Sequence, residues 1–242
     1  GLNDAPEKAV KHLRPHHCIL LAKNTKGRVN LYTLVSKSHL EYFHRYPLVP
    51  KSVLEKYREG LIVGSACCAG ELFEAVEEER SEEEIAKLVS FYDYLEVQPI
   101  GNNAFMIDAP KHENVHSEED LRELNRKIVK LGEQFNKRVV ATCDVHFLDP
   151  QDEIYRTIIQ AGRGMEEESS APLYLHTTEE MLNEFAYLGE KKAKEIVIDH
   201  PREILDMCDS ISPVRPDKCA PVIENSDGIL KPVSYTHLRA HE

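Results

Sequence analysis

The sequence predicts an α/β protein with a mostly parallel sheet, and two observations support this. Short apolar runs of strand length, such as residues 18–22 and 61–64, alternate along the chain with segments whose apolar residues recur at helical spacing. These runs are continuous rather than alternating, which is typical of strands buried on both faces, as in parallel sheets. About four such strands are expected, too few for a closed eight-stranded barrel, so we expect part of a barrel or an open sheet.

The first half of this pattern begins with a strand and a long helix. The expected strand spans residues 17–22, and the apolar residues of a helix follow over 31–42. Pro47 and Pro50 end that helix, because proline lacks the backbone N–H that a helix interior needs. The second strand is expected at 61–64, and the small residues that follow it mark its end.

The third and fourth strands are expected after helices that have N-terminal capping signals. Ser81 with Glu84 forms a capping box before an apolar stripe, and Ser117 precedes a second stripe. The strands are expected at 94–97 and 139–142.

Shorter helices are expected towards the C-terminus. Thr177 with Glu180 is another capping box. A further helix over 193–197 should stop before Pro201, and a last one should cover 204–208. From there on, prolines without helical spacing predict a linker.

Composition narrows the class of protein. The 242 residues carry 30 Lys and Arg against 42 Asp and Glu, a net charge of −12, which argues against a broad basic surface for nucleic acid. An acidic domain within a larger nucleic-acid enzyme remains compatible with this charge. No apolar run approaches the roughly 18–20 residues that span a bilayer, and no signal peptide is recognisable. Because the chain lacks an initial Met, we expect it to be a piece of a longer protein.

The six cysteines predict a reducing compartment. They form no CxxC pair, and Cys67 is adjacent to Cys68, which suits neither a zinc ribbon nor a disulfide framework. A cytoplasmic location is therefore expected.

Side chains able to bind a metal follow the expected strands. Asp144 and His146 end the fourth strand, and on an extended backbone their spacing puts both side chains on one face. They form half of a site for a divalent metal. Cys67 follows the second strand and His17 begins the first, so each is a further candidate ligand. The alternative for each is structural, as a hydrogen-bonded histidine or a buried cysteine.

Several ordered motifs resemble the PHP (polymerase and histidinol phosphatase) domain of bacterial replicative DNA polymerases. The motifs are residues 14–24, 59–67, 91–99 and 139–146. Residues 34–43 and 57–61 are similar to the PolC type of DNA polymerase III alpha subunit, and the resemblance runs from about Arg14 to about Glu224. It implies a distorted (βα)7 barrel with a multi-metal site at one end, of which this chain would be the part that follows an exonuclease insertion.

The resemblance also implies a ligand set. His17, Cys67, Asp144 and His146 match the later ligands of the family, whereas its early HxH motif does not occur in this chain. Gln98, after the third strand, is expected beside the ligands rather than on the metal. Mixed N, O and S donors suit zinc, with manganese or iron as alternatives.

The function implied is that of a parent enzyme, DNA-directed DNA synthesis from dNTPs with Mg. Its partners would be DNA, dNTPs and replisome proteins such as the sliding clamp, with no membrane contact. The local chemistry implied is metal-dependent phosphoester hydrolysis or a structural metal. Two alternatives stay open: a stand-alone phosphoesterase similar to histidinol phosphatase, and a non-enzymatic docking module of the replisome.

The expected organisation has four parts. Residues 1–13 would be a linker from an upstream domain, 14–208 the later part of the PHP domain, and 209–231 a linker toward the polymerase core. Residues 232–242 depart from the family and are expected to be a non-native tail.

Overall fold

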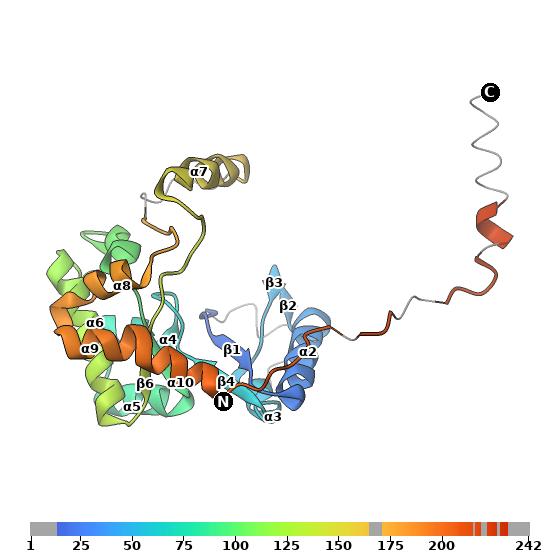
Figure 1. Ribbon diagram of the computed structural model, residues 1–242, viewed down its shortest axis with the longest axis horizontal. Coiled ribbons are helices and arrows are strands. Elements are labelled where there is room, and N and C mark those ends of the chain that lie inside the picture. The colour runs from blue at the N-terminus through green and yellow to red at the C-terminus, as the bar shows by residue number, and fades with distance from the viewer. Residues whose placement is uncertain (1–13, 165–170, 215, 219–221, 227, 232–242) are drawn as a thin grey trace. The chain divides into compact units, whose positions relative to one another are not determined.

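A computed structural model describes residues 14–164, 171–214, 216–218, 222–226 and 228–231 (Figure 1). The chain divides into two compact units, Gly1–Ile211 and Ser212–Glu242. Every helix and strand named below lies in the first unit. The predicted segments 1–13 and 232–242 lie outside the described residues, and the predicted limits 14–208 and 209–231 stay predictions.

A sheet forms the centre of the first unit. Its strands are β1 (Ile19–Ala22), β4 (Leu61–Gly64), β5 (Tyr94–Val97) and β6 (Arg138–Ala141), in the order β1-β4-β5-β6. The pairs β4–β5 and β5–β6 are parallel, which confirms the predicted α/β class and mostly parallel sheet. β1 is antiparallel to β4, with Ile19 opposite Gly64. The beginning of β1 therefore lies at the edge where the parallel strands end.

Helices cover both faces of this sheet. On one face, apolar side chains of β4 and β5 join the main core with α2 (Thr25–Leu40), α4 (Glu71–Glu77) and α6 (Glu118–Gln134). On the other face, Ile62, Tyr94 and Val140 pack with Ile204 of α10 (His200–Asp206) (Figure 1). This burial on both faces explains why the strands are continuously apolar.

The predicted capping signals open helices as expected. Ser81 caps α5 (Glu82–Phe91): its hydroxyl accepts the Glu84 N–H at 3.4 Å, and the Glu84 carboxylate accepts the Ser81 N–H at 3.3 Å. Ser117 caps α6, and the Thr177 capping box opens α8 (Thr178–Glu184). Each cap satisfies N–H groups that have no partner inside the helix.

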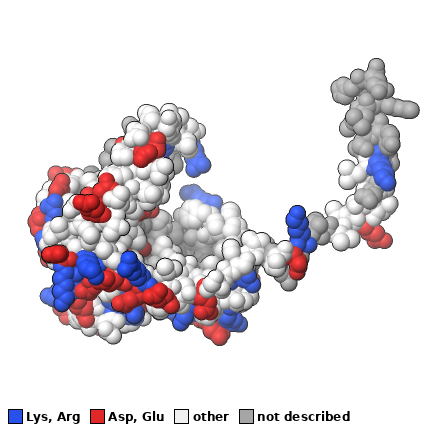
Figure 2. Space-filling model, viewed as in Figure 1, with Lys and Arg blue, Asp and Glu red and all other residues white. Residues whose placement is uncertain are grey.

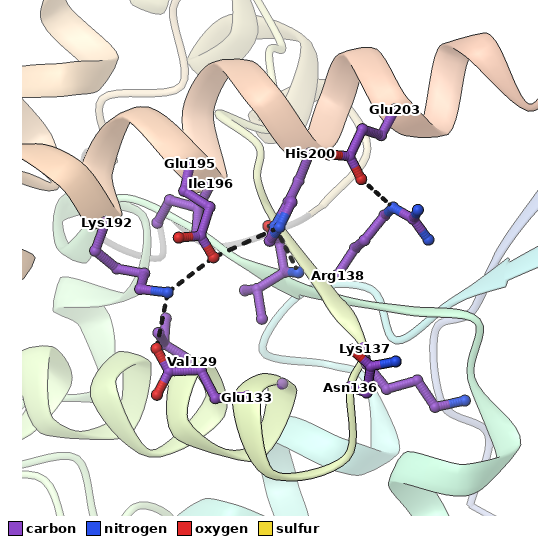
Figure 3. Close-up of a pocket in the computed structure, with 12 residues that line it drawn as sticks. Val129, Glu133, Asn136, Lys137, Arg138, Lys192, Glu195, Ile196, His200 and Glu203 are labelled. Atoms are coloured by element: carbon purple, nitrogen blue, oxygen red, sulfur yellow. Dashed lines mark hydrogen bonds and ion pairs between the residues drawn. The ribbon is translucent and has the colours of Figure 1, made fainter.

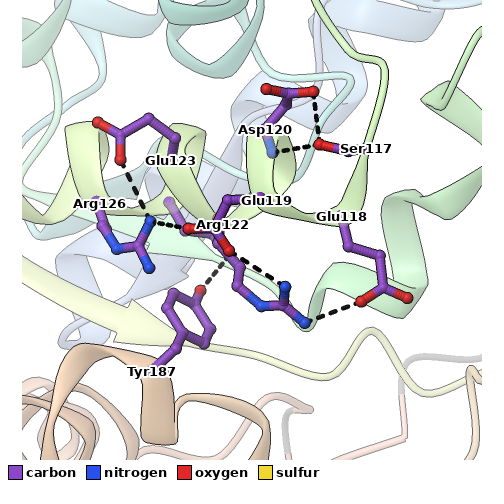
Figure 4. Close-up of polar contacts among 9 residues, drawn as sticks. Ser117, Glu118, Glu119, Asp120, Arg122, Glu123, Arg126 and Tyr187 are labelled. Carbon is purple, nitrogen blue, oxygen red and sulfur yellow. Dashed lines mark hydrogen bonds and ion pairs between the residues drawn. The ribbon is translucent and has the colours of Figure 1, made fainter.

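The exposed side of α6 carries its own ion pairs (Figure 4). Arg122 pairs with Glu118 at 2.9 Å, and Arg126 pairs with Glu119 at 2.6 Å. The face of the molecule in Figure 2 likewise mixes acidic and basic side chains, without an extended basic surface. Each exposed ion pair contributes little stability. The neighbouring carboxylates do, however, offset the positive charges of Arg122 and Arg126.

The prediction that a helix stops before Pro201 is wrong. α9 (Glu190–Lys194) continues through a π-helical turn, η4 (Glu195–Asp199), directly into α10, where Pro201 occupies the first turn. A π turn shifts the hydrogen-bond pattern along the backbone, so the missing proline N–H can be accommodated without ending the helix.

Several short elements were not predicted. The helix α2 ends at Leu40, and a small hairpin follows it. The unpredicted elements are β2 (Phe43–His44), β3 (Tyr46–Pro47), α3 (Lys51–Lys56), η1 (Ile100–Met106), η2 (Pro150–Asp152), α7 (Glu153–Gly162) and η3 (Ala186–Leu188). Most of them are too short for apolar periodicity to distinguish them from loops. None of the described helices has the length and apolar character that crossing a membrane requires.

Candidate metal centre

The reversed direction of β1 brings His17 to the carboxyl edge of the sheet. The His17 N–H donates to the Ala69 carbonyl at 2.9 Å, which fixes the residue beside the turn that follows β4. Cys67 lies in this turn, and its Sγ is 3.3 Å from His17 Nδ1. The structure thus brings together two predicted ligands that are 50 residues apart in the sequence.

This separation fits a shared metal ion. In a tetrahedral zinc site, bond lengths of about 2.3 Å to sulfur and 2.0–2.1 Å to nitrogen put the two donor atoms roughly 3.5 Å apart. A hydrogen bond from the Cys68 thiol, with further ones from the Ala69 backbone and His17, lowers the pKa of Cys67, whereas the pKa of Cys68 is raised. Cys67 is therefore favoured as the thiolate, the form that binds metals.

Asp144 and His146 form a second pair after β6. Asp144 Oδ1 lies 3.9 Å from His146 Nδ1, and the two side chains are 44% and 40% exposed. His146 Nδ1 is also 2.8 Å from the backbone oxygen of Asp144. Because a carbonyl oxygen can only accept, Nδ1 carries the proton and Nε2 keeps its lone pair for a metal.

Both loops contain a non-glycine residue in the left-handed region of backbone space. Ala66, directly before Cys67, has φ 62°, and Asp144 has φ 49°. Such a conformation costs about 1–2 kcal/mol per residue, and residues of this kind cluster at functional sites. Here the left-handed conformations of Ala66 and Asp144 turn the backbone at the two loops that carry the candidate ligands.

Glu96 is a site residue that sequence analysis missed. Its side chain lies in β5 with 6% of its surface exposed. Thr142 Oγ1 donates to Glu96 Oε1 at 2.7 Å, and the Glu96 N–H donates to Ser65 Oγ at 2.9 Å. Glu96 therefore links the ends of β4 and β6. The signal in the sequence is an acidic residue inside an otherwise apolar strand.

Burial raises the pKa of Glu96 to about 7. The hydrogen bond from Thr142 opposes this effect, and the nearby negative charges of Cys67 and Asp144 add to it. The influence of both charges on one carboxyl group indicates that the two ligand pairs face the same edge of the sheet. Gln98 is buried and also lowers the pKa of Glu96, so its side chain lies near that carboxyl group. Its place beside the ligands stays a prediction.

The structure brings the predicted ligands into two pairs rather than one closed shell. Within the described residues, no group of three or more His, Cys, Asp or Glu side chains surrounds one point. The donor types nevertheless fit a divalent ion, and the first pair also fits in distance.

Comparison with known proteins decides the family. The model of the PHP domain matches residues 4–99, which include His17 and Cys67. The DNA polymerase III PolC-type of Clostridium perfringens is 52% identical over 90% of this chain. Those of Caldanaerobacter subterraneus and Bacillus subtilis are 48% and 43% identical, each over 98% of the chain. The chain is a PHP-domain segment that matches PolC-type DNA polymerase III. The predicted resemblance is confirmed.

The PHP segment spans only a small part of these relatives. It covers 15% of the Clostridium protein and 17% of the Caldanaerobacter and Bacillus proteins. Asp144 and His146 lie beyond the residues that the family model matches. The part of all four residues, His17 and Cys67 included, in a metal centre stays a prediction.

A cavity of about 250 Å³ lies where β6 begins, away from these ligand pairs (Figure 3). Lys192 pairs with Glu133 at 2.7 Å and with Glu195 at 2.8 Å, and Arg138 pairs with Glu203 at 2.6 Å. These ion pairs join α6 and β6 to the helices α9 to α10. Lys137, which also lines the cavity, donates to the Tyr92 carbonyl at 2.6 Å. Because these charged side chains all contact other parts of the protein, we interpret the cavity as a structural contact between helices and sheet.

Proposed function

We propose that the PHP segment binds a divalent metal at the carboxyl edge of its sheet and hydrolyses phosphoesters there. His17, Cys67, Asp144 and His146 would hold the ion, with zinc favoured by the mixed donors and manganese or iron as alternatives. The 3.3 Å separation of Cys67 Sγ and His17 Nδ1 carries the proposal. A bound ion supplies Lewis-acid chemistry to a phosphoester and to water.

The protein's own residues would prepare this site for substrate. His146 keeps Nε2 free because its Nδ1–H donates to the Asp144 carbonyl. Glu96, with a pKa of about 7, can hold or release a proton near neutral pH. Thr142 fixes the Glu96 carboxyl group by a hydrogen bond of 2.7 Å.

The first test uses cobalt(II) as a spectroscopic probe of the thiolate ligand. We expect Cys67→Ser to abolish the thiolate-to-cobalt absorption and to weaken metal binding by at least about 100-fold, because a ligand is lost. Cys208→Ser is the matched control, since Cys208 Sγ donates to the Ile204 carbonyl on α10, outside the site. Unchanged absorption in Cys67→Ser would show that Cys67 is not a ligand.

Metal removal then separates a catalytic role from a structural one. We expect chelation to lower the melting temperature, because a ligand at about 1,000 times its dissociation constant stabilises by about 4 kcal/mol. We also expect it to abolish hydrolysis of a 5′-labelled oligonucleotide, with activity restored by added metal. A stability loss in a protein that never hydrolysed the substrate would support a structural metal instead.

For the parent protein, we propose DNA-directed DNA synthesis from dNTPs with Mg, in the cytoplasm. Support comes from the relatives, which are named DNA polymerase III PolC-type. DNA, dNTPs and the sliding clamp would be its partners. The present sheet would be part of a distorted (βα)7 barrel, since β1 and β6 each have one neighbour among the described strands.

Primer extension tests this proposal for the parent protein. We expect the polypeptide encoded by the complete reading frame to extend a primer, and residues 1–242 alone to extend none. Hydrolysis by a complete reading frame that synthesises no DNA would favour a stand-alone phosphoesterase similar to histidinol phosphatase. A complete protein with neither activity that binds replisome proteins would favour a docking module.

A further inference from the structure

A cavity of about 690 Å³ opens beside the candidate metal centre. It lies between the loop that follows β6 and the helix α7. His146 contributes to its wall, together with Phe147, Tyr155, Arg156 and Arg163. A molecule in this cavity would therefore contact a predicted metal ligand.

Two arginines of the cavity have no carboxylate partner in the described part of the chain. An Nη of Arg156 donates to the neutral Gln160 Oε1 at 3.2 Å, and no side-chain contact of Arg163 is found among these residues. Asp152 also lines the cavity, but its carboxylate accepts the backbone N–H of Asp149 at 3.1 Å. Among the other described arginines, Arg45 and Arg202 also lack a carboxylate partner, but neither lines this cavity. Those that pair with carboxylates are Arg14, Arg58, Arg80, Arg122, Arg126 and Arg138.

Two unpaired arginines that line the same cavity indicate a site for an anion, because the chain is so acidic. The chain has a net charge of −12, yet no carboxylate of the described residues pairs with either guanidinium group beside His146. The planar guanidinium donates two parallel hydrogen bonds, which matches a phosphate group.

The same cavity has an aromatic and aliphatic wall. Tyr155 is 64% exposed and Ile159 is 57% exposed, and no described residue of α7 is buried. Leu148 of the preceding loop is exposed as well. An exposed tyrosine ring next to cationic groups is the arrangement on which a nucleobase stacks while its phosphate is held.

We propose that this cavity is a nucleotide-binding subsite. Arg156 and Arg163 bind the phosphate, and Tyr155 and Ile159 pack against the base, so that the phosphoester lies next to His146. The subsite deepens the proposed function by naming its substrate class. Nucleotide binding does not itself need the metal, so the two proposals can fail separately. The nucleotide is either the end of a single strand or a free mononucleotide.

Binding is measured with the 242-residue chain and a fluorescein-labelled oligothymidylate, by anisotropy in low salt with a chelator present. We expect Arg156→Gln with Arg163→Gln to weaken binding about 30-fold, because two charge-assisted contacts are lost. The lysine pair Arg156→Lys with Arg163→Lys keeps the charge but not the paired geometry, so it should lose less. Arg202→Gln on α10 removes the same type of charge outside the cavity and should change binding by less than about twofold.

Competition identifies the group that is recognised. Unlabelled dTMP should displace the probe better than inorganic phosphate does, and Tyr155→Ala should remove this advantage. A strand end is the ligand if the oligonucleotide binds more tightly than dTMP, and a mononucleotide is the ligand if the two bind equally. Both results support the subsite.

Three results would overturn the subsite. They are an equal loss in Arg202→Gln and in the double variant, equal competition by dTMP and phosphate, and metal binding by a folded chain that binds no nucleotide. Melting curves of every variant confirm that each is folded. Nucleotide binding without hydrolysis in the metal-loaded chain would contradict the proposed function and leave the subsite in place.

Discussion

Replacing Gly27 by alanine should lower the free energy of unfolding by about 3 kcal/mol, the upper part of the range for overpacking. A Cβ at this position would lie 1.8 Å from the backbone oxygen of Gly60 and 2.5 Å from its carbonyl carbon. The neighbour is backbone and cannot rotate away. The Gly60 oxygen also accepts the Lys23 N–H at 2.8 Å, which ties the start of α2 to the beginning of β4.

Urea denaturation followed by circular dichroism measures this effect. Gly162→Ala is the matched control, because a Cβ there meets nothing within 4 Å and alanine is the better helix former by up to about 1 kcal/mol. If Gly27→Ala unfolds at the same urea concentration as the unsubstituted chain, the close approach of the two backbones does not exist in solution.

Glu96→Gln should change how the stability of the metal-free chain depends on pH. The pKa of Glu96 is about 7 in the folded chain, against an ordinary value of 4.5. The folded state therefore favours the protonated acid. The stability that this group contributes is fully present below about pH 4.5 and is lost as the pH rises through 7.

The expected change in the free energy of unfolding follows from the difference between the two pKa values of Glu96. Between pH 4.5 and pH 7.5, the unsubstituted chain should lose about 3 kcal/mol relative to Glu96→Gln. Glutamine can still accept the Thr142 hydroxyl, so the comparison isolates the charge. Glu82→Gln, an exposed change in the first turn of α5, should leave the pH profile parallel to that of the unsubstituted chain. A constant difference between the unsubstituted chain and Glu96→Gln across this range would refute the raised pKa.

Local signals in the sequence predicted much of the fold. Strand-length apolar runs located the strands β1, β4, β5 and β6 of the main sheet, because burial on both faces favours apolar side chains throughout a strand. The capping boxes at Ser81 and Thr177 located helix starts, because they satisfy N–H groups locally. The helix through Pro201 was missed, because its π-helical turn carries no comparable signal.

The site was harder to predict, since it depends on contacts between distant segments. The spacing of Asp144 and His146 drew attention to the pair, but the extended backbone expected there is wrong, because β6 ends at Ala141 and Asp144 has φ 49°. The pairing of His17 with Cys67 follows from the reversed direction of β1, which no local pattern encodes. The apolar neighbours of Glu96 predict a buried strand and say nothing of a role for the carboxyl group. That role follows from the hydrogen bonds of Glu96 with Thr142 and Ser65.

The contact between His17 and Cys67 has a consequence for folding. An ion that joins these residues would close a loop of 50 residues, and such a cross-link removes about 4 kcal/mol of conformational entropy from the unfolded chain. The loop contains α2 and α3 and ends just beyond β4, which pairs with β1. Such an ion would thus hold the non-local pairing of β1 with β4 in register while the remaining strands assemble, whether or not it also takes part in hydrolysis.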